Sequence, residues 1–438
     1  MAGFLGMRGT GDWATDERPK AWREAILFLY PNGDAPLTAI LSKMGEEKVS
    51  DPEFNWWTKT LPAQAGAITA IYTDFAMSSV YTSGGVAGQI VYVKVAEAVA
   101  DEFRVGHQVL LRDSSNYTVD VNAKVLAVNK NGALSCITVR LLEADDNGSN
   151  SNDLSDADRI LIIGNINPEG AYMPTGISYN PTKYNNYTQI LRTPLSITRT
   201  ARETKYRTGD KYKEMKREAL ELHGIEMEKA FIFGIPTEGT GDNGKPERTT
   251  GGIRHFIKTN VPNNASSFAL SSTYAGKDWT DADGGRHWLD TLLEQVFRYG
   301  SGEKFALCGS GALLGIQRLV EAGAHMNITP MTTSYGLKVR EWLTPFGTLY
   351  MKTAPLLSHE PSTRNGMLII EPKNLKYRFI TDTKFYGEGE SATSSAGNNS
   401  NRKDGTDEEF LTECGLEMHH PDTMMLLEDI GQDNRLTP

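Results

Sequence analysis

The sequence predicts an α+β protein in which extended segments, one long helix and a mixed α/β block follow each other along the chain. Three observations support this prediction. β-Branched runs broken by turns recur between Gly88 and Gly164, the strongest helical pattern covers Gly209–Phe233, and strand and helix patterns alternate after Trp288. The 438 residues are enough for two or three domains or subdomains.

The N-terminal segment Arg18–Leu61 has two short helical patterns followed by an extended aromatic run. The helical patterns cover Ala21–Tyr30 and Pro36–Met44, and the turn Pro31-Asn32-Gly33-Asp34 separates them. The large apolar side chains of the first pattern have too few local partners to be buried by the segment alone. We therefore predict that they pack on a distant part of this chain or on another copy of it.

Two extended segments flank the region of short strands. Ala63–Ser83 alternates apolar and small residues, and Met173–Ser196 is rich in Tyr and Asn. The region between them, at about 88–164, has the strand spacing of a small barrel or sandwich, interrupted by a hydrophilic loop. This order predicts an extended β-loop that carries an inserted small β-domain.

The long helix has recognisable start and stop signals. Asp210 is a suitable N-cap, and Gly234-Ile235-Pro236 ends the helical pattern. At about 1.5 Å per residue, the helix would be nearly 40 Å long. Its predicted apolar stripe consists of Met215, Ala219, Leu222, Ala230 and Phe233.

A mixed α/β block follows the Gly-rich loop Thr237–Gly252 and a short strand predicted at Ile253–Ile257. Helices are predicted at Trp288–Tyr299 and Ala312–Ala322. The predicted strands are Lys304–Cys308, Leu337–Leu343, Gly347–Thr353, Met367–Glu371, Tyr377–Thr381, Phe410–Met418 and Thr423–Leu427. The low-complexity stretch Gly387–Thr406 is predicted to be a mobile loop.

Composition narrows the possible functions. The formal charge of −10 argues against a chain that grips nucleic acid, which usually has a basic stripe. The three cysteines are far apart, which favours a reducing compartment without a disulfide framework or structural zinc. Neither a signal peptide nor a membrane span is predicted, so we expect the protein to be made and kept in the cytoplasm, or assembled there.

The most enzyme-like string is the predicted strand, turn and helix around Gly309–Gly315. Its spacing is G-x-G-x-x-x-G rather than the dinucleotide-binding G-x-G-x-x-G, so a tight structural turn is favoured over a nucleotide site. His419-His420-x-Asp422 resembles a metal corner, but adjacent histidines on a strand point to opposite faces. No catalytic constellation is found, and the chain is predicted to be neither an enzyme nor a cofactor-binding or metal-binding protein.

Several short blocks resemble a known family. Arg-Pro-Lys-x-Trp-Arg-Glu from Arg18, Pro-Asn-Gly-x-Ala-Pro-Leu-Thr from Pro31 and Asp-Pro-Glu-Phe-x-Trp-Trp from Asp51 resemble the N-terminal arm of tailed-bacteriophage major capsid proteins with the Hong Kong 97-type fold. The likeness continues in Ile197–Gly234 and in three short later blocks, and covers about half the chain. The later blocks are Arg248–Ile253, Leu343–Thr348 and Glu413–Glu417.

The resemblance implies a domain plan. Residues 1–50 would form the N-terminal arm, and residues 51–200 the extended loop with the inserted β-subdomain at about 88–164. Residues 201–287 would form the peripheral domain with its spine helix at about 209–233, and residues 288–380 the axial domain. Residues 381–438 would contain the mobile loop and return to the peripheral domain. The minimal fold of this family lacks the inserted β-subdomain.

The resemblance also implies a function: self-assembly into hexamers and pentamers of an icosahedral head that encloses double-stranded DNA. Partners would be copies of the chain itself, with portal, scaffolding and decoration proteins as further possibilities, no membrane, and packaged DNA only by non-specific proximity. The alternatives are a nucleotide-dependent enzyme that uses the Gly309–Gly315 turn, or a tail or baseplate protein. The protein would be located in the virion, as part of the capsid.

Aromatic residues of the arm, the extended loop and the Tyr-rich segment are the candidates for contacts between subunits, because large aromatic side chains dominate interface energetics. The alternative is that they pack within their own subunit. The candidates are Trp22, Phe28, Phe54, Trp56, Trp57, Tyr184 and Tyr187.

Overall fold

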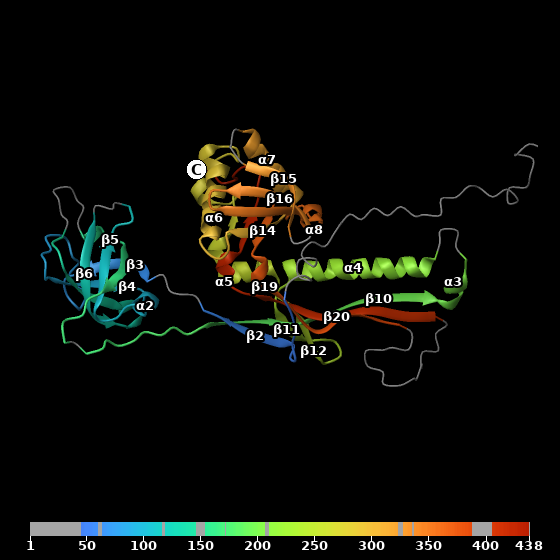
Figure 1. The fold of residues 1–438 in the computed structure, drawn as a ribbon, viewed down its shortest axis with the longest axis horizontal. Helices are drawn as coiled ribbons and strands as arrows, with labels where there is room; N and C mark the ends of the chain where they lie inside the picture. The colour runs from blue at the N-terminus through green and yellow to red at the C-terminus, as the bar shows by residue number, and fades with distance from the viewer. Residues whose placement is uncertain are drawn as a thin grey trace, which may run out of the picture. The chain divides into compact units, whose positions relative to one another are not determined.

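The computed structural model describes residues 45–59, 64–115, 119–145, 154–170, 172–205, 210–322, 327–334, 337–387 and 405–437. It divides into two compact units. One unit is Trp57–Thr182, and the other combines Met1–Trp56 with Lys183–Pro438. Figure 1 shows how the elements are arranged within each unit.

The unit Trp57–Thr182 is a closed antiparallel barrel whose strands are joined in the order β3-β4-β7-β6-β5-β8. Alternate side chains point inward and fill it, as a small barrel requires. Its elements are β3 (Ala65–Tyr72), β4 (Ile90–Val95), α2 (Glu97–Ala100), β5 (His107–Arg112), β6 (Asp120–Asn129), β7 (Cys136–Leu141) and β8 (Arg159–Asn165).

The barrel begins before the predicted boundary at Gly88. Strand β3, which the sequence pattern placed in the extended loop, pairs with both β4 and β8 and closes the barrel. Ile68 and Ile71 of β3 are buried in the barrel core. Small residues at inward-facing positions of β3 weaken its apolar pattern. One of them, Gly66, lies against the Val99 side chain, which would overlap any Cβ at that position.

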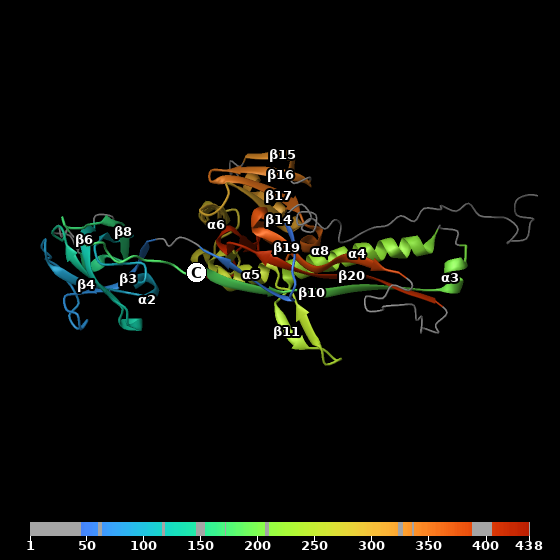
Figure 2. The ribbon, with the colours of Figure 1, turned by 60° about the horizontal axis from the view of Figure 1, so that its bottom comes forward.

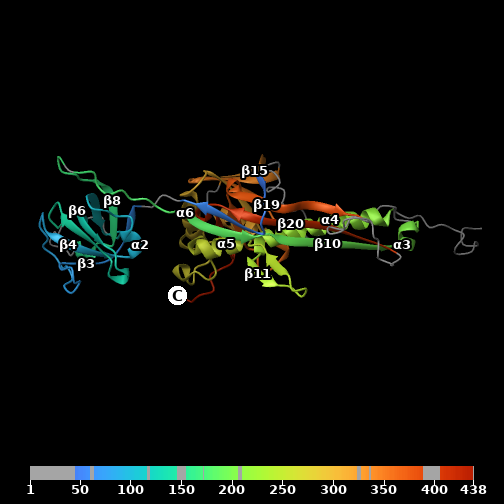
Figure 3. The same ribbon diagram turned by 90° about the horizontal axis from the view of Figure 1, so that it is seen from below.

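The larger unit contains a four-stranded sheet in the order β1-β19-β20-β10. Strands β10 and β20 pair antiparallel over ten residues, Gln189–Thr198 with Gly405–Cys414. Figure 3 shows them side by side along their length. The elements are β1 (Glu46–Lys48), β10 (Gln189–Thr198), the short helix α3 (Arg199–Glu203), β19 (Leu375–Tyr386) and β20 (Gly405–Met418).

Helix α4 (Lys211–Phe233) lies along one face of the β10–β20 pair (Figure 1). The predicted cap is confirmed, since the Asp210 carboxylate accepts hydrogen bonds from the backbone N–H groups of Tyr212 and Lys213. The predicted stripe is partly wrong: Leu222 is 53% exposed and Phe233 is also exposed. The buried positions are Ala219, His223, Met227, Glu228, Phe231 and Ile232.

His223 is the polar centre of this helix–sheet contact. Its ring nitrogens lie 2.9 Å from the Thr193 hydroxyl on β10 and 2.6 Å from the Thr412 hydroxyl on β20. Burial lowers the pKa of the His223 imidazole, while the nearby Glu226 carboxylate acts in the opposite direction. The neutral ring therefore joins the helix to both long strands.

A seven-stranded mixed sheet forms the rest of the larger unit, in the order β13-β21-β18-β14-β17-β16-β15. Its strands are β13 (Ala265–Ser267), β14 (Glu303–Cys308), β15 (Asn327–Ser334), β16 (Leu337–Thr344), β17 (Gly347–Thr353), β18 (Met367–Ile370) and β21 (Met425–Glu428). The helices of this region are α5 (Ile253–Asn260), α6 (His287–Phe297), α7 (Ser310–Glu321) and α8 (Pro355–His359).

This sheet separates two hydrophobic cores. Phe305 and Leu307 of β14 face the core shared with α4 and β20, whereas Ala306 and Cys308 face the core shared with α6 and α7. The alternation follows from the two-residue period of a strand. Strand β21 also belongs to this sheet and pairs with β13 and β18, whereas β20, from the same C-terminal region, joins the four-stranded sheet.

The strand predicted at Ile253–Ile257 is wrong, because these residues begin helix α5. Ile253, Phe256 and Ile257 are buried, at spacings of three and four that place them on one face of a helix. Gly252 is the N-cap residue of this helix.

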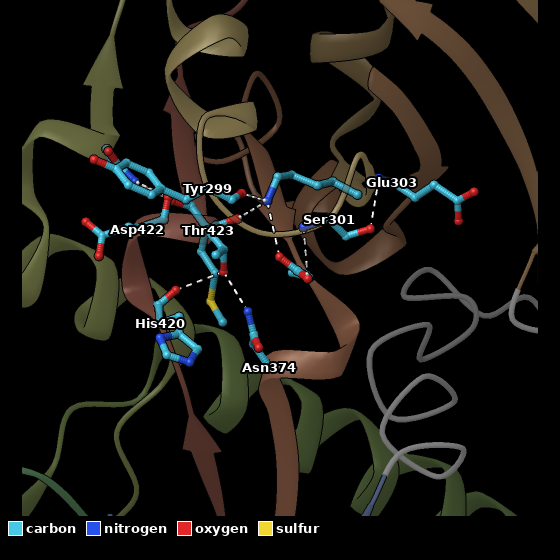
Figure 4. Close-up of polar contacts among 11 residues, drawn as sticks. Tyr299, Ser301, Glu303, Asn374, His420, Asp422 and Thr423 are labelled. Atoms are coloured by element: carbon cyan, nitrogen blue, oxygen red, sulfur yellow. Dashed lines mark hydrogen bonds and ion pairs between the residues drawn. The ribbon is translucent and has the colours of Figure 1, made fainter. Parts of the chain in front are cut away.

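A buried ion pair joins the neighbouring ends of β14 and β18 in the middle of the seven-stranded sheet, and Figure 4 labels Tyr299, Ser301 and Thr423 among the residues around it. The Lys304 ammonium lies 3.3 Å from the Glu371 carboxylate and donates to the backbone carbonyls of Tyr299 and Thr423, at 3.1 and 2.9 Å. The backbone N–H of Ser301 donates to the other Glu371 oxygen. Burial lowers the pKa of the Lys304 ammonium, and the Glu371 carboxylate opposes that shift.

We predict that Lys304→Ala lowers the free energy of unfolding by about 3–5 kcal/mol, because it leaves the Glu371 carboxylate buried without its cation. The double variant Lys304→Met, Glu371→Leu should lose much less, since neither charge remains buried. Urea unfolding of the full chain measures both. Equal losses for the two variants would contradict the ion-pair explanation.

We predict that residues 64–170, expressed alone, fold cooperatively, because the barrel closes on itself and contains its own core. Circular dichroism during thermal unfolding should show a single sharp transition. The shorter segment 88–164, which lacks β3, is the matched control and should unfold without cooperativity. A noncooperative melt of residues 64–170 would show that the barrel needs the rest of the chain.

We predict a histidine-dependent loss of stability in acid. The folded-state pKa of His223 lies below its ordinary value near 6.5, so the stabilisation is present above about pH 6.5 and is lost as the pH falls toward the folded-state pKa. Thermal unfolding from pH 7.5 to 5 should therefore show a steeper decline for the native chain than for His223→Gln. Parallel declines would rule out His223 as the acid-sensitive group.

Candidate assembly surfaces

The α4–β10–β20 region is only two layers thick. Leu191, Leu195 and Ile197 of β10 face the helix and are buried, whereas Ile190 on the other face is 58% exposed. Arg192 on that open face forms an ion pair with Glu409 of β20, and this exposed pair contributes little stability. Within the described residues, the second face of this strand pair is covered by no helix. We treat this face as a candidate contact surface.

Strand β1 is an edge strand that attaches the chain's N-terminal part to the four-stranded sheet. It runs parallel to β19, with Glu46 opposite Tyr377 and Lys48 opposite Phe379. Arg378 forms ion pairs with Glu47 on β1 and with the buried Glu417 on β20. The described chain therefore begins at a fixed point on the sheet edge.

Glu417 is the buried end of this charge network. Burial acts to raise the pKa of its carboxyl, but hydrogen bonds from His419 and Arg378 outweigh it and hold the pKa below its usual range. His419 therefore contacts a carboxylate of its own chain.

Its neighbour His420 has a left-handed backbone (φ +48°). Among the described residues, no group of three His, Cys, Asp or Glu side chains can hold a metal ion.

The two-stranded ribbon of β2 (Glu53–Thr58) and β9 (Thr182–Tyr187) contains five of the seven predicted contact residues. Phe54 and Trp56 are buried in the core of their own chain. The Trp56 indole stacks on Tyr184 at 6.1 Å, and its N–H donates to the Met418 carbonyl. These two side chains therefore have little surface left for a neighbour.

The other predicted contact residues are placed differently. Trp57 is 59% exposed and remains a contact candidate, as does Tyr187, which is half-buried. Tyr184 is half-buried against the core. Trp22 and Phe28 lie outside the described residues, as do the two helical patterns around them.

The Gly-rich segment after α4, predicted as a loop, contains a hairpin of β11 (Thr237–Thr240) and β12 (Pro246–Thr249). Figure 2 shows it projecting from the strands at its base. The side chains of β11 are exposed, and Arg248 pairs with Glu238 across the hairpin. The turn signal Asp242-Asn243-Gly244, with a left-handed Gly244 (φ +70°), indicates this hairpin in retrospect.

The Gly309–Gly315 turn is filled by the chain itself. A Cβ on Gly309 would lie 2.1 Å from the Arg364 carbonyl oxygen, and one on Gly311 would lie 2.1 Å from the Asn365 side-chain oxygen. The first N–H groups of α7 donate to protein acceptors, including Gly311 to the Arg364 carbonyl. A phosphate would need that same space and those same donors. The glycines serve close packing, as the favoured interpretation predicted.

The whole sequence has a formal charge of −10. In the part of the chain that the structure describes, no helix is long and apolar enough to cross a bilayer.

Comparisons with known proteins agree with this geometry. The family model described as SU10 major capsid protein matches residues 23–431. The chain is 24% identical to the "Major capsid protein" of Pseudomonas phage PaMx41 over 416 residues, which cover 92% of this chain and 90% of that protein.

The chain resembles solved structures more loosely. A chain from Mycobacterium phage Cain has 8% identity and a TM-score of 0.44, with 99% of both chains covered. A chain of the SrpI encapsulin complex from Synechococcus elongatus PCC 7942 has 14% identity and a TM-score of 0.38, with 58% of this chain and 78% of that chain covered. The family match extends over most of the sequence, and the chain belongs to the SU10 major capsid protein family.

Proposed function

We propose that this major capsid protein self-assembles into hexamers and pentamers of an icosahedral phage head that encloses double-stranded DNA. The main support is the two-layer α4–β10–β20 region, whose second face has exposed Ile190 beside charged residues. A thin, extended element of this kind gains stability when neighbouring copies cover it. Many modest interfaces then add up to a durable shell.

Within this proposal, residues 1–50 act as an arm that reaches a neighbouring subunit. The anchoring of β1 on β19 supports it, because Arg378 ties the base of the arm to the buried Glu417. Force on the arm would be transmitted to the four-stranded sheet rather than to a loose terminus. Trp22 and Phe28 are the proposed anchors on the neighbour, with Trp57, Tyr184 and Tyr187 as contacts of the β2–β9 ribbon.

The proposed domain plan places the barrel on the extended loop of residues 51–200. Residues 201–287 with helix α4 form the peripheral domain, and residues 288–380 form most of the axial domain around the capsomer centre. The observed sheets support one adjustment: β19 extends into the four-stranded sheet and β21 belongs to the seven-stranded sheet. We therefore assign β21 to the axial domain.

The proposed relation to DNA is one of proximity. A chain with a formal charge of −10 repels the phosphate backbone and can enclose DNA without adhering to it. In this proposal the copies assemble in the host cytoplasm, and portal, scaffolding and decoration proteins are further candidate partners. It requires neither catalysis nor a cofactor.

We predict that deletion of residues 1–44, which keeps β1 in place, leaves a soluble and folded protein that does not form shells. The arm supplies contacts between copies, whereas the described core of each unit lies outside it. Sedimentation velocity of the deletion variant and of the full chain at equal concentrations measures the effect. The full-length variant Trp22→Ala, Phe28→Ala should show the same defect, and shells of normal yield from the deletion variant would refute the arm proposal.

A further inference from the structure

The barrel has an apolar patch on the outer side of β3 and β4 and of the turn between them. We call Tyr72, Phe75, Val80, Ile90 and Tyr92 the barrel patch. Phe75 is 59% exposed, and its ring meets the Tyr92 ring edge-on at 5.9 Å. Tyr72 lies opposite Tyr92 across the strands and opposite Val80 across an isolated bridge. The five side chains therefore lie together on one surface.

The turn that presents Phe75 is held by its own hydrogen bonds. The Asp74 carboxylate accepts from the backbone N–H groups of Ser78 and Ser79, at 3.1 and 2.8 Å, and from the Ser78 hydroxyl at 2.7 Å. Met77 adopts a left-handed backbone (φ +55°), a conformation that costs free energy for a side chain of this size. Phe75 is thus presented by a preorganised turn, which lowers the entropy lost on binding.

A row of basic side chains borders the patch. On the outer side of the sheet, Arg140 of β7 lies directly opposite both Ile90 of β4 and Lys124 of β6. Like charges at directly opposite positions destabilise a sheet. Among the described residues, Lys124, Arg140 and the nearby Lys94 form no ion pair. A partner with negative charge would remove this repulsion.

The basic row is a local exception. The barrel unit, Trp57–Thr182, has eight Lys and Arg residues against thirteen Asp and Glu residues. The bordering row is therefore positive on a unit whose net charge is negative. An aromatic and aliphatic centre with charged residues at its rim is typical of a protein interface.

The larger unit has a groove of complementary character. It lies between the β11–β12 hairpin and the β10–β20 strands, and we call it the acidic groove. The exposed Ile190 provides an apolar wall, and Asp242, Glu247 and Glu413 line it against one lysine, Lys245, that has no ion pair in the described chain. The groove's arginine, at position 248, is neutralised by its pair across the hairpin.

We propose that the barrel patch of one copy docks in the acidic groove of a second copy of this chain. This inference rests on the proposed function, in which every copy is surrounded by others. The patch supplies Phe75 as the apolar anchor for Ile190, and Lys124 and Arg140 meet the groove carboxylates. A second copy is favoured over nucleic acid because the patch centre is apolar and the chain as a whole is acidic.

The first test compares patch variants with matched variants elsewhere on the barrel, all in the full chain. Phe75→Ser is matched by Val105→Ser, which is 57% exposed, and Arg140→Glu is matched by the exposed Arg159→Glu. The measured quantity is the lowest protein concentration at which shells sediment. The patch variants should raise it by about tenfold or more, as expected for interface anchors, while the matched variants leave it near the native value.

The second test exchanges charges. Lys124→Glu with Arg140→Glu should impair assembly, and so should Asp242→Lys with Glu247→Lys, whereas the fourfold variant should recover most of the native yield. Unimpaired patch variants, or a fourfold variant as defective as either double variant, would overturn the docking proposal. Thermal unfolding confirms that each variant is folded. Failure of the native chain itself to form shells would instead count against the proposed function.

Discussion

The antiparallel pairing of β10 with β20 is the constraint on which the larger unit depends. It joins Gln189–Thr198 to residues more than two hundred positions later, in a continuous ten-residue register. Helix α4 packs on this pair through His223, whose ring bonds to a threonine on each strand. Strand β19 continues the sheet, and β1 is added at its edge. Without this pairing, the helix would have no strand pair to pack against, and the sheet that carries β1 would lose a strand.

The same pairing gives the larger unit a thin, extended region, in which one helix layer lies on one strand layer. One face of the strand pair is covered by a helix of 23 residues, about 34 Å long at 1.5 Å per residue, and no helix of the described chain covers the other face. Buried groups that resemble reactive sites serve the fold instead: Lys304 and Glu371 hold strand ends together, and Gly309 and Gly311 admit close backbone contacts.

Local signals predicted much of this structure. The Asp210 cap, the charged face and the stop at Gly234 indicated α4, and β-branched runs indicated most barrel strands. The helical stripe was partly wrong because His223 and Glu228, which are polar, occupy buried positions that Leu222 was expected to share. The position of Trp56 inside its own chain and the Lys304–Glu371 pair depend on contacts between residues far apart in sequence, and a single sequence contains no signal for such pairings.

The central claim is that copies of this chain assemble with one another. Electron microscopy of the purified, concentrated protein tests it most directly, because assembled particles can be seen in the images. The account predicts rings, capsomers or closed shells built from this chain alone, with sedimentation far faster than that of a 48.3 kDa monomer. A monodisperse monomer or small oligomer at every concentration, with no larger particle in the images, would contradict it.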